Sequence, residues 1–162
     1  MPIRAATPAD VTAIERVARA SWHTDYPDVL SRETVEEGVE EWYDDEQLTA
    51  EIERDDAVVL VARREGEIDG FAHAVVTEDR GTILRVYVHP DARGEGIGSR
   101  LLDRTEGELR DRGANHVQAM VLADNELGRT FYEGAGFTLE DEGETTIGGD
   151  PYRECVYGLL EE

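Results

Sequence analysis

The stretch from Val86 to Leu102 constrains this chain more than any other part of its sequence. It reads as a β-branched strand, a proline, a glycine-rich turn and the first turn of an amphipathic helix. Glycines at positions 94, 96 and 98 let successive backbone N–H groups converge on one point, because no Cβ blocks a positive φ or a close approach. The helix that follows aims its unpaired N–H groups and the positive end of its dipole at the same point. The turn is therefore expected to bind a phosphate or pyrophosphate, with the Ser99 hydroxyl as a further donor.

Two common phosphate-binding motifs do not fit this turn. A P-loop requires a lysine after its last glycine, and the chain contains no lysine. The dinucleotide fingerprint requires G-x-G-x-x-G, whereas residues 94–98 read G-x-G-x-G and follow a strand late in the chain. The other alternative is a purely structural turn, in which each glycine would cost roughly 1 kcal/mol of helix stability without binding anything.

Two motifs in order point to one family. Residues 93–98, Arg-Gly-Glu-Gly-Ile-Gly, resemble the R/Q-x-x-G-x-G/A acyl-CoA signature of the GNAT superfamily of N-acetyltransferases. Downstream, the segment from Asn125 to Phe137 is similar to that family's N-x-x-(A/G)-x-x-F-Y-x-x-x-G-F pattern. With the strands around them, the motifs cover residues 82–137. The resemblance implies an acetyl-CoA-dependent enzyme without a metal, which transfers acetyl to a primary amine by direct nucleophilic attack.

The resemblance leaves two questions of function open. The acceptor is either a small amine or a protein N-terminus. From a different functional class, the alternative is a regulatory or sensor domain that binds acyl-CoA without catalysis.

Apolar periodicity predicts the order of helices and strands. We expect strands at residues 3–6, 57–64, 68–78, 82–89, 116–122, 137–147 and 152–160. We expect helices after the cap at residues 7–10, around 32–41 and on to 54, at 96–112 and at 126–135. These elements predict one α/β domain over residues 1–162, with a mixed, mostly antiparallel sheet and flanking helices. The resemblance implies a GNAT-like acyl-CoA N-acyltransferase fold with a central splayed strand pair.

The resemblance also implies the cofactor site. The pantetheine arm would lie between the splayed strands and bond the backbone of Val86 and Val88, and N–H groups near Val88 would stabilise the oxyanion. Asn125 is expected to cap the following helix and to contact the cofactor arm. The complete set of expected cofactor-binding residues is Val86, Tyr87, Val88, Arg93, Gly94, Glu95, Gly96, Ile97, Gly98, Ser99, Asn125 and Tyr132.

Tyr132 is the expected general acid. A departing thiolate needs a proton, and a phenol with a pKa near 10 retains one at neutral pH. Its neighbour Phe131 is expected to belong to the core.

The general base is less well indicated. Family members often carry a glutamate on the strand before the acyl-CoA motif, but residues 82–85 read Thr-Ile-Leu-Arg. Glu78 is the nearest candidate, followed by His73 and His89, although His89 precedes a proline and reads as a strand terminus.

The resemblance implies that the acceptor is recognised by the segment after the first helix and by the loop before the last strand. The candidate residues are Trp22, His23, Asp25, Tyr26, Trp42 and Tyr43. The alternative is that they are core aromatics and solvated acids, and the sequence does not name the acceptor.

A net charge of −22 limits the partners of this chain. Nucleic acid is not expected, because phosphate contacts need clustered cations, and no apolar run approaches membrane-spanning length. All sixteen basic residues are arginine. The repulsion between the many acidic side chains is screened best in concentrated salt. The composition therefore predicts a protein of a salt-accumulating cytoplasm. The single Cys155 excludes an internal disulfide and reads as buried, and a homodimer is left open.

Overall fold

A computed structural model describes residues 3–25, 37–39, 44–94, 96–147 and 149–159. Within these residues, seven strands form one sheet in the order β1-β2-β3-β4-β5-β7-β6. The strands are β1 (Ile3–Ala5), β2 (Ala57–Arg64), β3 (Glu67–Thr77), β4 (Arg80–Val88), β5 (His116–Leu122), β6 (Phe137–Ile147) and β7 (Asp150–Leu159). The helices are α1 (Val11–Asp25), α3 (Asp45–Glu53), α4 (Ile97–Asp111) and α5 (Glu126–Gly134), with 3-10 turns at Pro8–Asp10 and Pro90–Ala92.

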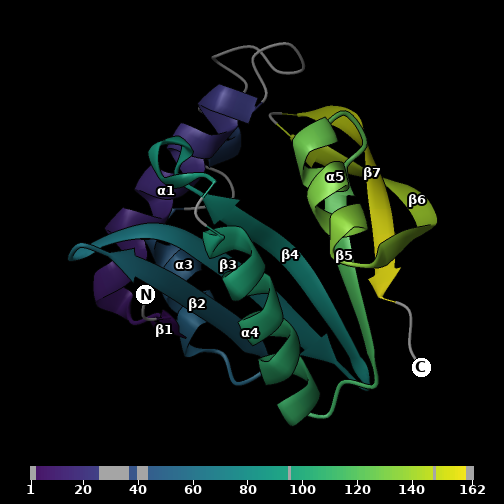
Figure 1. Cartoon of the computed structure of the whole chain (residues 1–162), viewed down its shortest axis with the longest axis horizontal. Coiled ribbons are helices and arrows are strands. Elements are labelled where there is room, and N and C mark those ends of the chain that lie inside the picture. Colours follow the sequence, from purple (N-terminus) through teal and green to yellow (C-terminus); the bar gives the residue numbers. More distant parts are fainter. Residues whose placement is uncertain (1–2, 26–36, 40–43, 95, 148, 160–162) are drawn as a thin grey trace.

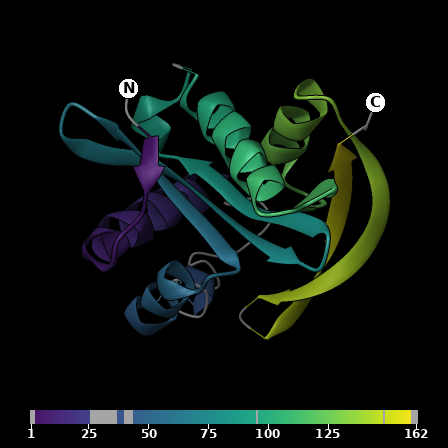
Figure 2. The same cartoon turned by 90° about the horizontal axis from the view of Figure 1, so that it is seen from below.

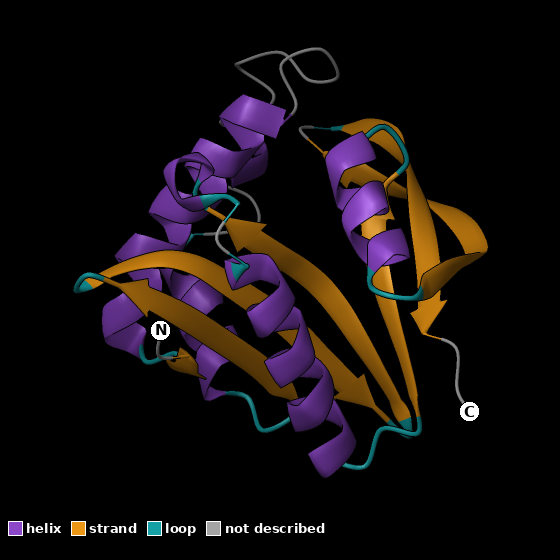
Figure 3. Cartoon of the chain, in the orientation of Figure 1, coloured by secondary structure: helices purple, strands orange, loops and turns teal. Residues whose placement is uncertain are grey.

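The helices cover both faces of the sheet, as Figures 1 and 3 show from one side. Helices α4 and α5 lie on one face, and α1 and α3 lie on the other (Figure 2). Each face has its own apolar cluster, one beneath α4 and α5 and one beneath α1 and α3. The apolar side of α1 faces the second cluster, where Val11, Ile14, Val17 and Ala18 are all buried.

Glycines in the strands allow α4 to lie close against the sheet. A Cβ on Gly81 would sit 2.9 Å from a methyl carbon of Leu109, and one on Gly70 would sit 3.1 Å from methyl carbons of Ile97 and Leu101. Larger residues at these positions would push the helix, and the glycine-rich turn before it, away from the strands.

Strands β4 and β5 pair in parallel over a short length and then separate. Their register runs from Arg80 opposite His116 to Ile83 opposite Ala119, and no later residues of the two strands pair. All other described pairs of neighbouring strands are antiparallel. In Figure 1 the two ribbons start together and then diverge, with β5 running toward α5 and β4 running away from it. The expected splayed strand pair and the mostly antiparallel sheet are therefore confirmed.

A β-bulge marks the place where β4 leaves β5. His73 of β3 pairs with Arg85, whereas the next residue, Ala74, pairs with Ile83. Leu84 is therefore an extra residue on β4, inserted directly after the last pair with β5. Bulges bend a strand and re-aim its side chains, so this one changes which side chains face which helix layer beyond the splay.

Some predicted boundaries were wrong. The expected turn at 79–81 is a two-residue loop, because Thr77 pairs with Arg80, and Glu78 lies in that loop with φ 58°. The tighter loop suits the twist of the two strands and extends their pairing. His89 lies beyond the end of β4, and Gly96 caps α4 rather than belonging to it. Most of the expected helix at 32–41 lies outside the described residues, although 37–39 are helical.

Candidate active site

The glycine-rich turn presents the N-terminus of α4 to an open space. Gly94 and Gly96 have φ values of 86° and 80°, which residues with a Cβ rarely adopt. Gly96 is the N-cap of the fifteen-residue helix α4, so the first N–H groups of that helix have no partner within it. A Cβ at either position would have no atom within 4 Å, so glycine is needed here for the positive φ and not for lack of space.

A cavity of about 280 Å³ lies in front of this turn, between β4 and α5. Its walls contain most of the residues predicted to bind the cofactor. They are Val86, Tyr87, Val88, Arg93, Gly94, Gly96, Ile97, Gly98, Ser99 and Asn125, together with Ala92, Leu127, Gly128 and Phe131. Glu95 lies outside the described residues, and Tyr132 lines a neighbouring cavity instead. We refer to this space as the acyl-CoA cavity.

The backbone of β4 faces the opening between the splayed strands. The N–H of His89 donates to the carbonyl of Asp69 at 2.7 Å, so residue 89 bonds toward β3. Because bonding direction alternates along an antiparallel strand, Val88 and Val86 turn their N–H and C=O groups away from β3. The Val88 carbonyl accepts from Nε of Arg93 at 3.2 Å and from Oγ of Ser21 at 3.3 Å. Arg93 and α1 therefore brace the strand at its open edge.

Asn125 caps α5 at the opposite wall. Its Oδ1 accepts a 3.0 Å hydrogen bond from the N–H of Gly128, and the side chain is buried. The capping role predicted from the sequence is confirmed.

A second, narrower cavity of about 50 Å³ lies where the strands have separated. Val86, Tyr87, Asn125, Gly128 and Phe131 line both cavities, so the two spaces meet between β4 and α5. The remaining walls of the second cavity are Trp22, Leu84, Arg85, Met120, Val121, Leu122, Tyr132 and Glu154. Two of these residues, Trp22 and Leu122, belong to the apolar cluster on the α1 and α3 side of the sheet. We refer to this space as the acceptor cavity.

Two ionisable residues, Glu154 and Tyr132, line the acceptor cavity. Glu154, on β7 opposite Leu122, is half-buried, and burial raises the pKa of its carboxyl group, while Arg85 lowers it. Tyr132 is 4% exposed, and burial raises the pKa of its phenol above the usual value near 10. Its ring is held by Phe131, Phe137 and Tyr157, with centroid distances of 5.3, 5.5 and 6.4 Å. The site thus combines a carboxylate of raised basicity with a phenol that remains protonated at neutral pH.

A family model of the GNAT acetyltransferases matches residues 16–137. The chain belongs to the acetyltransferase (GNAT) family. The spermidine N(1)-acetyltransferase of Thermoplasma acidophilum is 30% identical over 159 residues, which cover 96% of each chain. The crystal structure of the PaiA N-acetyltransferase of Thermoplasma acidophilum in complex with coenzyme A has a TM-score of 0.83 and 30% identity, and covers 94% of this chain and 96% of that one.

More distant relatives share the fold alone. The ribosomal-protein-S18-alanine N-acetyltransferase of Escherichia coli has a TM-score of 0.73 at 18% identity, covering 98% of this chain and 92% of that one. The predicted GNAT fold is confirmed, and the chain is an acetyl-CoA-dependent N-acetyltransferase. In the described part of this acetyltransferase, no three His, Cys, Asp or Glu side chains are grouped to hold a metal ion, and no helix is long and apolar enough to cross a bilayer.

The three residues predicted as candidates for the general base lie outside both cavities of the acetyltransferase. Glu78 is in the loop at the start of β4, about 26 Å of extended strand from Val88. His89 uses Nδ1 to accept from the N–H of Asp91, which caps the 3-10 turn. His73 is buried on the α3 side, where Glu51 and Arg85 engage both of its ring nitrogens. None of the three lines either cavity.

Sequence reasoning missed Glu154. The signal available was an acid two residues after Tyr152 in a strand whose alternate residues, Cys155 and Tyr157, are buried. Alternation alone assigns such a residue to a solvated face. Only the opening beside Leu122 shows that this face lines a cavity.

Of the residues predicted to line the acceptor pocket, the structure places Trp22 in a cavity wall. Trp22 is 1% exposed and lines the acceptor cavity, and His23 is half-buried on α1 but lines neither cavity. The side chain of Asp25 and the residues Tyr26, Trp42 and Tyr43 lie outside the described residues. Phe131, expected in the core, packs against it but also lines both cavities. Cys155 is buried, as expected.

Proposed function

We propose that this enzyme acetylates a primary amine of a small, linear polyamine-like molecule, and that Glu154 is the general base. The observation that carries the proposal is the position of Glu154. Its carboxylate lies in a cavity that shares walls with the acyl-CoA cavity but holds none of the glycine-rich turn. Acetyl-CoA and the amine can therefore enter separately and meet beside Val86.

The acyl-CoA cavity supplies contacts for both parts of the cosubstrate. The N–H groups at Ile97, Gly98 and Ser99 bind the pyrophosphate at the positive end of the α4 dipole. The pantetheine arm lies along β4 and bonds the outward-facing backbone of Val86 and Val88, as an added strand would. The oxygen of the thioester carbonyl then accepts a hydrogen bond from a backbone N–H of β4, which stabilises the negative charge that develops during attack.

The amine must lose a proton before it attacks. An alkylamine with a pKa near 10.4 is protonated at pH 7, and its deprotonation costs roughly 4–5 kcal/mol. The ammonium binds beside the carboxylate of Glu154 and transfers one proton to it. Because burial raises the pKa of this carboxyl group, it is a stronger base than a solvated glutamate.

The neutral amine then attacks the thioester carbonyl, and the carbon–sulfur bond breaks. Tyr132 donates a hydrogen bond to the departing sulfur. Complete proton transfer from this phenol is uphill, because its pKa is raised while that of a thiol lies near 8.5. The second proton of the attacking nitrogen therefore ends on the thiol, passing through the Tyr132 hydroxyl. The products are the acetamide and coenzyme A, and the proton held by Glu154 returns to solvent.

Two observations support a small amine over a protein N-terminus. The acceptor cavity is narrow and lined by the aromatic residues Trp22 and Tyr87, beside Glu154 and Arg85, so that a slender chain can enter and pair one ammonium group with the Glu154 carboxylate. The relative that is 30% identical over nearly the whole chain is named for spermidine, whereas the E. coli ribosomal-protein enzyme shares only the fold.

A panel of polyamines, amino acids and short peptides, followed by thiol release from acetyl-CoA in molar KCl, tests the proposal. Polyamines should react fastest, and Glu154→Gln should lower their kcat/KM on the order of 10²-fold or more. Glu144→Gln removes the same charge from an exposed position on β6 and is the matched control. Full activity of Glu154→Gln, or a preference for peptides, contradicts the proposal.

A further inference from the structure

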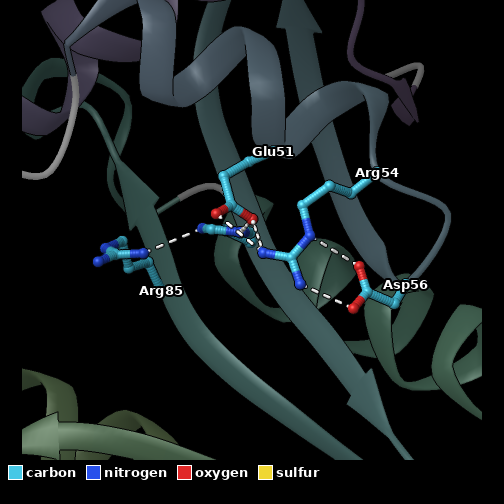
Figure 4. Close-up of polar contacts among 5 residues, drawn as sticks. Glu51, Arg54, Asp56 and Arg85 are labelled. Atoms are coloured by element: carbon cyan, nitrogen blue, oxygen red, sulfur yellow. Dashed lines mark hydrogen bonds and ion pairs between the residues drawn. The ribbon is translucent and has the colours of Figure 1, made fainter.

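A buried histidine links helix α3 to the strand that lines the acceptor cavity. His73, on β3, is 7% exposed and pairs in register with Arg85 of β4. Its Nδ1 lies 3.0 Å from Nη1 of Arg85, and its Nε2 lies 3.3 Å from Oε2 of Glu51. Figure 4 labels Arg85 and Glu51, the partners of the two ring nitrogens.

The chemistry of the partners fixes the state of the ring. A guanidinium has only donors, so Nδ1 of His73 must accept from Arg85 with its lone pair. The proton of the neutral ring is then on Nε2, which donates to the carboxylate of Glu51. Burial, and secondarily the positive charge of Arg85, lowers the pKa of His73 to about 4, so the ring stays neutral at pH 7.

The contacts continue from Glu51 to the surface. Nη1 of Arg54 donates to Oε1 of Glu51 at 3.2 Å, and the same guanidinium bonds Asp56 at 2.9 and 2.7 Å. Glu51 of α3 therefore contacts the imidazole, and Arg54 at the end of α3, itself paired with Asp56, holds the Glu51 carboxylate (Figure 4). At the other end of this series of contacts is Arg85, which lines the acceptor cavity.

Arg85 and Glu154 line the same cavity from different strands. Besides them, the titratable groups in its walls are the phenols of Tyr87 and Tyr132. Around His73 the charged groups are Glu51 and Arg54 of α3 and Arg85 of β4. Arg85 is the group that offsets the burial of the Glu154 carboxyl. The β-bulge at Leu84 coincides with this arrangement, since it lies immediately before Arg85.

We propose that His73 is a positioning residue for acetyl transfer: its Nδ1 lone pair holds the guanidinium of Arg85 on the wall of the acceptor cavity that Arg85 shares with Glu154. The inference rests on the proposed function, in which Glu154 takes a proton from the amine. Loss of the imidazole acceptor removes one of the contacts that position the guanidinium, and the half-buried carboxylate of Glu154 is then expected to take up a proton at a higher pH.

The pH dependence of kcat/KM for a polyamine tests the proposal. In the wild type, activity should fall on the acid side as Glu154 becomes protonated. Releasing the guanidinium in His73→Leu, or removing it in Arg85→Gln, should move this acid limb to higher pH by about one unit. The double variant should have the limb of Arg85→Gln alone, because His73 acts through Arg85. His73→Asn, whose Oδ1 can replace Nδ1 as the acceptor, should keep the wild-type limb.

The controls separate this proposal from the proposed function. Glu154→Gln should abolish the acid limb together with most of the activity; a retained limb in that variant rejects Glu154 as the base. If Glu154→Gln behaves as expected but His73→Leu only lowers Tm and kcat without moving the limb, His73 has a packing role and the present inference is wrong. Where His73→Leu does not fold, Arg85→Gln decides, since an unmoved limb in that variant also overturns the inference.

Discussion

The backbone N–H of Gly128 donates a 3.0 Å hydrogen bond to Oδ1 of Asn125, and a Cβ on residue 128 would lie 2.6 Å from Nδ2 of the same side chain. The same Cβ would lie 2.8 Å from a methyl carbon of Val121. Asn125 and Gly128 both line the two cavities. The absence of a side chain at 128 therefore sets the width of the place where the cavities meet.

Gly128→Ala should impair the enzyme more than it destabilises the fold. The new methyl group displaces Asn125, while alanine in a helix offsets part of the loss by about 1 kcal/mol of propensity. We expect acetyl-CoA affinity to fall on the order of tenfold, measured by calorimetry, with a small change in Tm. Gly134→Ala, on the same helix with nothing within 4 Å of its Cβ, is the control and should bind normally. Equal affinities in the two variants would show that Gly128 does not shape the site.

Gly96→Asp tests the assignment of the pyrophosphate site. Aspartate at the N-cap of α4 places a carboxylate where the phosphates are expected, so coenzyme A binding should be lost in calorimetry. The variant also forces a side chain onto a φ of 80°, which costs roughly 1–2 kcal/mol. Gly113→Asp imposes a similar strain at φ 101° near the other end of α4 and should retain full affinity. A folded Gly96→Asp protein with unchanged affinity would place the pyrophosphate elsewhere.

The sequence predicted the acyl-CoA side of the site better than the acceptor side. Glycines at 94, 96 and 98 and the Asn125 cap are local signals, because turn conformation and capping depend on neighbouring residues. The acceptor side depends on contacts that join β4, β7 and α1, and no local pattern brings Glu154 to Arg85.

The β-bulge at Leu84 explains another failure of pattern reading. Strict alternation along residues 82–89 would put Leu84 and Arg85 on opposite faces of the sheet. The extra residue breaks that alternation, and both residues line the acceptor cavity. Neither strand propensity nor alternation contains a signal for this insertion. The strand could therefore be predicted from the sequence, but the position of Arg85 in the wall of a cavity could not.

The charge of the chain predicts a strong salt dependence. At −22, repulsion between carboxylates opposes folding, and the Debye length shrinks from about 30 Å at 0.01 M salt to about 3 Å at 1 M. Tm should therefore rise steeply between dilute buffer and molar KCl, as measured by calorimetry or circular dichroism. Sucrose at matched osmolarity is a control that does not screen charge. A Tm that is flat in KCl would contradict the predicted adaptation to concentrated salt.

Tyr132→Phe isolates the role of the phenol in the proposed mechanism. The ring keeps its contacts with Phe131, Phe137 and Tyr157, so Tm and acetyl-CoA affinity should stay close to wild type. Losing the hydrogen bond to the departing sulfur should lower kcat on the order of 10²-fold for an acceptor whose chemistry is rate-limiting. In the wild type, burial raises the pKa of this phenol, so its ionisation should produce no decline of kcat below about pH 10. A phenylalanine variant with full kcat would reduce Tyr132 to a packing residue, and the proton on the thiol would then have to come from water.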